Sequence, residues 1–472
     1  MDAPSYQQLL CENQQLREHL AQRDRCIEQL EQTVRDLHQR LEEVERSAKR
    51  QAAPFSKGPP KKRPKRPGRK KGDQHGRHAH RPPPPPERID ETHDAPLPER
   101  CPDCGGKIIE DHRDRQYQTD IPRQPIVRQF TIHCGHCERC GKPVRGRHPL
   151  QTSDATGAAR SQLGPDAQAA VVYLNKRAGL SYGKIADTFQ TFYGIPLTPG
   201  AGAQIVRRAG KILQPVYEEI REHLRSSAHL TPDETGWRIG GHPAWLHDWV
   251  GDDGATLYAI DPQRSADVLE QVIGRDWSGS MTHDGFSSYE RFQDAVHQQC
   301  VDHALRRARR LLEKHRGAAA TFPRQVIDLF TRALRLRDRL NEANADEDRR
   351  VRAYDQYTER LMELTERPRC NEANERFAKH LHRHTGSWFM FLLDPAIPAT
   401  NHRAEQALKT PIVNRKVWGG NRTELGGQAQ SVTCSVLQTC RNRAVDTFAF
   451  LSNAFRGVLG KLFTSPADND AK

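Results

Sequence analysis

Three acidic residues that lie far apart in the sequence, Asp233, Asp284 and Glu405, stand where a fold of strands and helices would bring their carboxylates to one point. Clustered carboxylates repel one another, and a divalent cation relieves that repulsion. Mg²⁺, or Mn²⁺ in its place, prefers such oxygen ligands, and two neighbouring ions can activate an attacking oxygen and stabilise the leaving oxygen of a phosphodiester. The residue types therefore predict metal-dependent phosphoryl transfer on nucleic acid.

The segments around these residues have the patterns of the elements that would position them. Strands are predicted over 227–233, 244–250, 256–260 and 279–283, with turn residues between the first three. The first three form an antiparallel meander, and a fourth strand beside the first would place Asp284 near Asp233. Farther along, Thr400 or Asn401 can cap a helix that carries Glu405 on its second turn.

Five short strings surround the three acidic residues: DETGW at 233–237, HDGF at 283–286 with Tyr289, CVDH at 300–303, TNHRAE at 400–405 and RKVW at 415–418. In these strings the chain resembles the DDE transposases of the insertion sequence sixty-six family. The resemblance implies a ribonuclease H-like catalytic domain, a helical insertion before Glu405 and a catalytic triad of Asp233, Asp284 and Glu405. It also implies two Mg²⁺ ions, both contacted by Asp233, and possible accessory transposition proteins. The expected reaction is hydrolysis at transposon ends, followed by attack of the freed 3′-hydroxyl on target DNA.

Basic residues near these elements are candidates for DNA binding. Lys409, Arg415 and Lys416 follow Glu405 closely enough to meet phosphates beside the scissile bond. Arg207 and Arg208 would lie on the second helix of a helix-turn-helix arrangement, whose helices begin after Ser181 and Thr198. The alternatives are a solvated basic face for the first group and three-helix packing without DNA contact for the second.

Two C-x-x-C-G motifs predict a structural zinc site with the ligands Cys101, Cys104, Cys137 and Cys140. Four thiolates suit tetrahedral Zn²⁺, and a closed site of this kind has no catalytic role. Cys134 offers an alternative ligand in place of Cys140. The remaining unclustered cysteines are interpreted as structural: Cys11, Cys26, Cys370, Cys434 and Cys440.

A seven-residue repeat runs from Tyr6 to Val44. One core position holds Tyr6, Asn13, Leu20, Ile27, Val34 and Leu41, and the other holds Leu9, Leu16, Arg23, Leu30, Leu37 and Val44. Such a repeat, with a buried Asn and β-branched residues at the first position, favours a parallel coiled coil. We therefore expect a homodimer or a higher oligomer, the alternative being one helix that packs on its own chain.

The formal net charge of +13 is concentrated in one segment. Thirteen Lys and Arg against one Asp give residues 49–81 a charge of +12, so the rest of the chain is nearly neutral at +1. This Pro-rich segment cannot bury enough surface to fold. It either contacts the phosphates of DNA or is a solvated spacer. No apolar stretch is long enough for a membrane span or a signal peptide. We expect no membrane partner and a cytoplasmic, nucleoid-associated location.

Together these patterns predict a multidomain α+β protein. Its expected parts are a coiled coil over 1–47, a basic linker over 48–90, a zinc-binding module over 91–150, a helical DNA-binding region over 151–224, a ribonuclease H-like catalytic domain over 225–304 and 392–425, a helical insertion over 305–391 and a C-terminal helical region over 426–472. Two other functions stay open. One is a non-catalytic DNA-binding protein derived from a transposase, because His402 and Gln406 stand where the family pattern has Asn and Arg. The other is a metal-dependent nuclease.

Overall fold

The structure is a computed structural model. It describes residues 14, 17, 20, 21, 23, 24, 27–34, 37, 83–107, 109, 115–119, 124–155, 162–369 and 371–463. The chain divides into two compact units, Met1–Pro82 and Pro83–Lys472. Within the described residues, no helix is long and apolar enough to cross a membrane.

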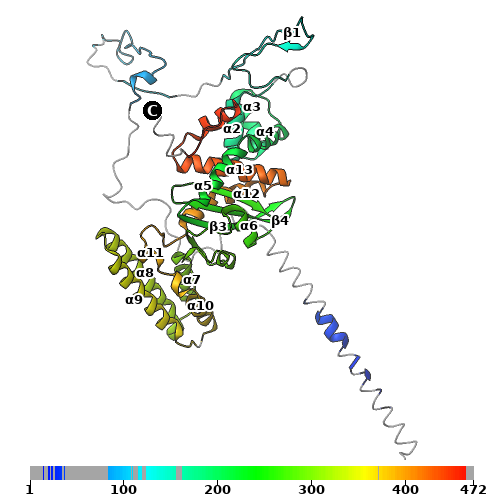
Figure 1. Cartoon of the computed structure of the whole chain (residues 1–472). Helices are drawn as coiled ribbons and strands as arrows, with labels where there is room; N and C mark the ends of the chain where they lie inside the picture. The colour runs from blue at the N-terminus through cyan, green and yellow to red at the C-terminus, as the bar shows by residue number, and fades with distance from the viewer. Residues whose placement is uncertain are drawn as a thin grey trace, which may run out of the picture. The chain divides into compact units, whose positions relative to one another are not determined.

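A five-stranded mixed sheet forms the centre of the second unit (Figure 1). Its order is β5-β4-β3-β6-β7, and the strands are β3 (His229–Ile239), β4 (His242–Gly251), β5 (Thr256–Asp261), β6 (Ser280–His283) and β7 (Val296–Gln299). The first three strands are antiparallel, whereas β6 runs parallel to both β3 and β7. The predicted meander and the predicted fourth strand beside the first are therefore confirmed.

The first strand is longer than predicted. β3 continues through Asp233 to Ile239, so Asp233 lies inside the strand and not at its end. The strand turns only at Gly240 and Gly241, which both have positive φ, 60° and 86°. A two-residue turn of this kind matches the twist of a hairpin, and glycine adopts it without steric cost. Pairing with β4 thus extends β3 through the whole DETGW string.

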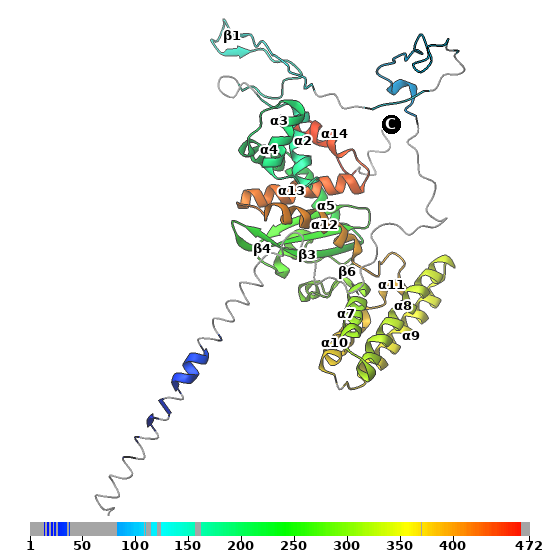
Figure 2. The same cartoon turned by 180° about the vertical axis from the view of Figure 1, so that it is seen from behind.

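Helices cover both faces of the sheet. One face packs with a large core that includes Leu230, Trp249 and Leu257. The other face packs under α12 (His402–Trp418), with Trp237 and Leu408 in the shared core. The remaining helices around the sheet are α2 (Pro165–Lys176), α3 (Tyr182–Tyr193), α4 (Pro199–Ile212), α5 (Gln214–Arg225), α6 (Ala266–Ile273), α13 (Glu424–Asn442) and α14 (Thr447–Phe455). In the view from behind, α13 lies between the group α2–α4 and the sheet (Figure 2).

The helix-turn-helix-like pair has the caps that the sequence predicts. The Ser181 hydroxyl accepts a hydrogen bond from the Lys184 amide at the start of α3. The Thr198 hydroxyl accepts one from the Ala201 amide at the start of α4. Both caps satisfy backbone donors that the first turn of a helix leaves free.

The free edge of β5 is closed by a ladder of hydroxyl groups on α13. Ser431, Ser435 and Thr439 stand four residues apart, so they share one face of the helix. Their oxygens accept hydrogen bonds from the backbone amides of Ile260, Tyr258 and Thr256, at 3.1, 2.8 and 3.0 Å. An edge strand without such partners would present its amides to other chains. This contact makes α13 part of the sheet domain.

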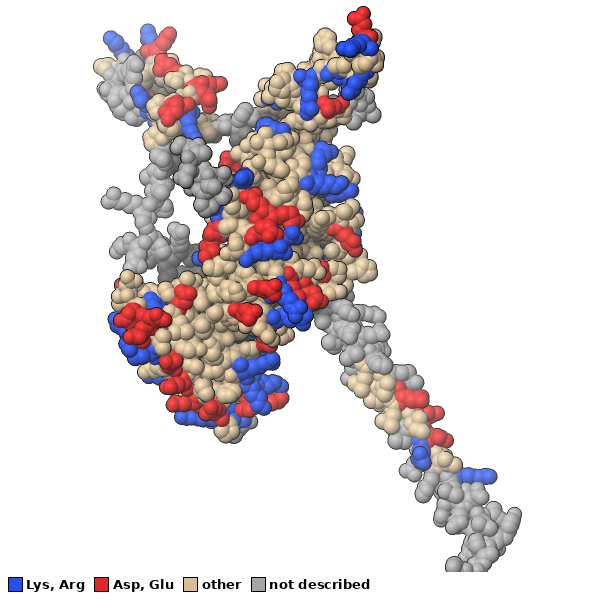
Figure 3. All heavy atoms as spheres, viewed as in Figure 1, with Lys and Arg blue, Asp and Glu red and all other residues tan. Residues whose placement is uncertain are grey.

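The segment between β7 and α12 is helical, as predicted, and has its own core, which contains Phe330, Phe377 and Trp388. Its helices are α7 (Val301–Lys314), α8 (Thr321–Glu342), α9 (Glu347–Glu366), α10 (Glu372–Arg383) and α11 (Met390–Leu393). On the face shown in Figure 3, basic and acidic side chains are interspersed over the second unit. This agrees with the nearly neutral charge outside residues 49–81.

The remaining elements are short. The 3₁₀ helices are η1 (Pro86–Arg88), η3 (Ser287–Arg291), η4 (Gly317–Ala320) and η5 (Thr385–Ser387). β1 (Cys134–His136) and β2 (Pro143–Arg145) form a two-stranded antiparallel sheet. Residues 38–82, which include most of the basic linker, and the cysteines Cys11, Cys26 and Cys370 lie outside the described residues.

Candidate active site

A row of polar side chains crosses the sheet under α12. Asp233 on β3 is paired with Asp248 on β4, and Asp248 is paired with Tyr258 on β5. β6 pairs with β3 so that Ser280 is opposite His229, and the same offset puts Asp284, directly after β6, opposite Asp233. Residues opposite each other in a sheet point to the same face. Strand register therefore brings Asp233 and Asp284 together.

The third acidic residue is delivered by α12. The helix begins after Asn401, whose backbone amide donates to the Cys300 thiol at 3.4 Å, and Glu405 lies in its first turn. Farther along, Pro411 has no amide hydrogen, which leaves the Ala407 carbonyl without its helical partner. The Tyr258 hydroxyl donates to that carbonyl at 2.8 Å. This bond fixes α12 to β5 at the end of the polar row.

The pKa of Asp233 records how closely the acidic groups lie. Burial first, and then the charges of Asp284, Glu234 and Glu405, together raise this pKa from 3.8 to about 7. Only the backbone amide of Glu234, which donates to Asp233 Oδ1 at 2.8 Å, acts against this shift. The charges of Asp284 and Glu405 thus both act on Asp233, and no basic side chain among the described residues offsets them at Asp233.

Glu405 has a cationic partner from the helical insertion. Arg306 on α7 donates from Nη2 to Glu405 Oε1, and its Nε lies 3.0 Å from Asp302 Oδ2. His303, one turn before Arg306 on α7, lies with Nε2 at 3.9 Å from Glu405 Oε1. Burial, and then the charge of Arg306, lowers the pKa of His303. Arg306 is not recognisable from the sequence as a partner of Glu405, because the contact joins residues 99 positions apart.

Asp248 is a second residue that the sequence analysis did not assign. Its side chain is 0% exposed, and neither carboxylate oxygen has a hydrogen-bond partner in the described part of the chain. Burial, followed by the charges of Asp233 and Glu234, raises its pKa well above the usual value. A signal was present in the sequence, since Asp248 alternates with Leu246 and Val250 on the buried face of β4.

Glu234, beside Asp233, belongs to the opposite face of the sheet and has a structural role. It accepts hydrogen bonds from the Tyr289 hydroxyl at 2.6 Å and from Arg264 Nε at 3.0 Å. The guanidinium of Arg264 lies over the Phe286 ring, 3.9 Å from its centroid. The string DETGW is therefore linked to the string HDGF and to Tyr289 through ionic and aromatic contacts.

The five predicted DNA-binding residues differ in their surroundings. Arg415 is half-buried and donates to the Gly236 carbonyl and to the Thr235 hydroxyl, so it fixes α12 to β3. Two others have polar neighbours on the protein: Lys409 donates to Gln406 at 2.7 Å and Arg208 to Gln168 at 2.9 Å. Lys416 is exposed and Arg207 is half-buried. Gln406 also lies 2.9 Å from His402, so these two residues pair with each other beside Glu405.

The two cysteine motifs fold separately. Backbone hydrogen bonds close each turn, from Gly105 to Cys101 and from Gly141 to Cys137. The amides and thiols of Cys104 and Cys140 lower the pKa of Cys101 and of Cys137, respectively. Across the described residues, no group of three or more His, Cys, Asp or Glu side chains has an arrangement that could hold a metal ion. The four-thiolate zinc site with Cys101, Cys104, Cys137 and Cys140 therefore stays a prediction. Cys134 lies on β1, and Cys434 and Cys440 are buried, as predicted for structural cysteines.

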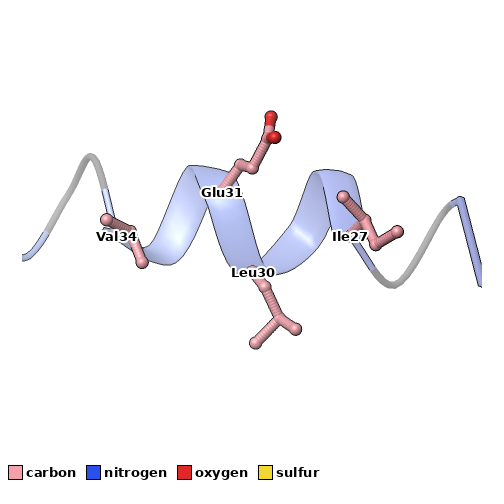
Figure 4. Close-up of a pocket in the computed structure, with 4 residues that line it drawn as sticks. All are labelled: Ile27, Leu30, Glu31 and Val34. Carbon is pink, nitrogen blue, oxygen red and sulfur yellow. The ribbon is translucent and has the colours of Figure 1, made fainter.

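In the N-terminal unit, the described positions between 14 and 37 are helical. Ile27, Leu30 and Val34 line a shallow apolar pocket with Glu31 (Figure 4). The three apolar side chains are 50%, 60% and 53% exposed. They occupy the two core positions of the predicted heptads, so the described part of this helix presents its apolar side to solvent.

Comparison with known proteins identifies the class to which this sheet and polar row belong. A family model described as Transposase IS66 family matches residues 160–429, which is more than half of the chain. The chain belongs to this family of transposases, and family membership implies that it acts on DNA. It is also similar to a protein of Sinorhizobium fredii called "Uncharacterized protein y4hP", with 23% identity over 404 residues, 76% of this chain and 71% of that protein.

The family implies a divalent cation, and the donor set of the polar row suits one. Asp233, Asp284 and Glu405 supply the hard oxygen ligands that Mg²⁺ prefers, and the raised pKa of Asp233 shows that their charges lack compensation. In this structure the Glu405 carboxylate accepts a hydrogen bond from Arg306. The residues present therefore fit the ion once Glu405 is released.

Proposed function

We propose that this protein is a DDE transposase that cleaves DNA at transposon ends and joins the freed 3′ ends to target DNA in one active site. The observation that supports the proposal is the strand register: the offset between β3 and β6, continued one residue past the end of β6, would set Asp284 opposite Asp233. The helix above this part of the sheet carries Glu405. A ribonuclease H-like arrangement of the sheet fits this role.

In this proposal, Asp233, Asp284 and Glu405 would supply the ligands of two Mg²⁺ ions. Bound Mg²⁺ would supply Lewis-acid stabilisation of the charge that develops on the attacking and leaving oxygens. Asp233 and Asp284 are held rigidly by the sheet, whereas Glu405 is held by α12, which Arg415 and Tyr258 fix to the strands. The backbone positions of the three acidic residues are thus set before DNA arrives, which lowers the entropic cost of the reaction once the Glu405 side chain leaves Arg306.

The other parts of the chain have proposed roles in binding. The apolar side of the N-terminal helix would pair with the same helix of a second copy, since its exposed residues follow the heptad positions. Lys416 and Arg207, with Lys409 and Arg208, would contact phosphates, and the basic segment 49–81 would add contacts that depend strongly on salt. Arg415 would act mainly by fixing α12. A zinc module over 91–150 stays a prediction.

The test uses the purified full chain with DNA that carries the element ends, a target plasmid and Mg²⁺. Joined products are expected for the wild-type protein. Asp233→Asn, Asp284→Asn and Glu405→Gln should abolish cleavage and leave end binding largely intact. Asp294→Asn, which alters an exposed carboxylate, is the matched control and should react like the wild type.

Three outcomes would contradict the proposal or its assignment of residues. Binding of the ends by the wild-type protein without cleavage would indicate a DNA-binding protein derived from a transposase. Cutting without joining, above all of branched DNA, would indicate a nuclease. Retained cleavage by Asp233→Asn would show that the triad is wrongly assigned.

A further inference from the structure

Arg306 connects two carboxylates that lie on different elements. Its Nη2 donates to Glu405 Oε1 on α12, and its Nε lies 3.0 Å from Asp302 Oδ2, one turn earlier on α7. The ring nitrogens of His303 lie 3.2 and 3.3 Å from the same Nη2. The side chains of Arg306 and Glu405 are 39% and 31% exposed. The pair is therefore partly open to solvent.

A hydrogen bond from a guanidinium to a carboxylate oxygen competes with the binding of a metal ion to the same oxygen. Charge-assisted bonds of this kind are stronger than neutral ones, and a metal ion must displace them to coordinate the same oxygen. Arg306 takes the place of a cation at one of the three carboxylates.

Arg306 also has a partner to keep when it leaves Glu405. Asp302 precedes it by four residues, the spacing at which a helix brings an acidic and a basic side chain together. Its planar donor group can equally bind a phosphate through two parallel hydrogen bonds. The partial exposure of the pair leaves room for such a phosphate to approach.

We propose that Arg306 is a displaceable counter-ion of Glu405. In the metal-free protein it holds the Glu405 carboxylate away from the metal position. When a divalent cation is bound, Arg306 pairs with Asp302 and turns to the phosphate backbone of the bound DNA. Arg306 is thus a positioning residue that makes metal loading depend on the helical insertion. This inference rests on the proposed function.

The test measures Mn²⁺ binding to the full-length protein without DNA, by the paramagnetic resonance signal of free Mn²⁺. Mn²⁺ is a suitable probe because it prefers oxygen ligands to thiolates. Arg306→Gln should tighten Mn²⁺ binding by about three- to tenfold, since the competing bond is lost. Asp302→Asn should weaken binding, because Arg306 loses its second carboxylate and stays on Glu405. Arg306→Lys should fall between the wild type and Arg306→Gln.

Arg310→Gln is the matched control, because it removes an exposed arginine from the same helix. It should bind Mn²⁺ like the wild type. A purely structural role for Arg306 would weaken binding in both Arg306→Gln and Asp302→Asn, so opposite changes in the two variants are the diagnostic result. Circular dichroism of each variant checks that the helices are retained.

The failure of this inference can be told apart from the failure of the proposed function. If wild-type protein binds Mn²⁺ and Asp233→Asn does not, the proposed metal site at the three carboxylates is supported. Unchanged or weaker binding by Arg306→Gln would then overturn the role of Arg306 alone. If wild-type protein binds no Mn²⁺, or if Asp233→Asn binds it equally well, both proposals fall.

Discussion

Replacing Asp233 by Asn should stabilise the metal-free protein at alkaline pH, although it removes a proposed catalytic group. Burial and neighbouring acidic charges raise the pKa of Asp233 from 3.8 to about 7. A carboxyl group with a raised pKa in the folded state favours folding less as the pH rises. The loss of folding free energy caused by Asp233 is absent below the pKa of the unfolded state, about 4, and is complete above pH 7. The wild-type protein should therefore lose stability between pH 4 and pH 7, and the variant should lose less.

The size of this effect follows from the pKa shift. One pKa unit corresponds to about 1.4 kcal/mol, so the shift sets an upper limit of about 4 kcal/mol at pH 8. Asp233 is only half-buried, which reduces the effect, and part of the loss of stability is already present at pH 5. The wild-type protein should therefore lose about 2 kcal/mol of unfolding free energy between pH 5 and pH 8. Asn has nearly the same shape as Asp and leaves no cavity.

The assay is urea unfolding of both proteins at pH 5 and pH 8 in the presence of a chelator, repeated with Mg²⁺. Mg²⁺ should stabilise the wild-type protein at pH 8 and have little effect on Asp233→Asn, because a ligand that binds only the folded state raises its stability. Asp294→Asn, an exposed carboxylate, serves as the control and should follow the wild type. If the unfolding free energies of Asp233→Asn and the wild type differed by the same amount at pH 5 and at pH 8, the reasoning would be refuted.

Three further substitutions test other contacts. Leu30→Glu places a charge on the apolar side of the N-terminal helix and should convert the proposed dimer to a monomer in analytical ultracentrifugation; an unchanged mass would argue against the coiled coil. Arg415→Met removes the bonds to Gly236 and should lower the stability by about 2 kcal/mol in urea unfolding while end binding persists, whereas a selective loss of DNA affinity would assign Arg415 to phosphate contact. Tyr289→Phe leaves Glu234 with one donor fewer and should cost about 1–2 kcal/mol of unfolding free energy; no change in the urea midpoint would mean that water replaces the hydroxyl.

Local patterns were enough to predict the parts of the fold that depend on neighbouring residues. Alternating apolar residues and turn signals predicted the four strands around Asp233 and Asp284, and Ser181 and Thr198 marked the starts of two helices. The position of Asp284 beside Asp233 followed from the rule that a strand after a crossover helix pairs in parallel with an earlier one. The predicted domain boundaries stay predictions. Most of α13 falls in the predicted C-terminal region over 426–472, and its hydroxyl groups bond to β5 of the sheet.

Contacts between distant segments could not be predicted in the same way. Arg306 and Glu405 belong to helices with independent patterns, and only the packing of α7 beside α12 brings them together. Asp248 looks like one of many acidic residues until its burial is known. The predicted strand ends at Asp233, whereas β3 continues to Ile239, because its second half is held by pairing with β4, in which Gly236 lies opposite Trp245.

The hydroxyl ladder on α13 has a consequence for anyone who shortens this chain. The family match ends at residue 429, and a fragment cut there would lack Ser431, Ser435 and Thr439. The amides of β5 would then be open to strands from other molecules, and such fragments should precipitate on expression. A useful minimal catalytic fragment must therefore continue to Asn442, the end of α13.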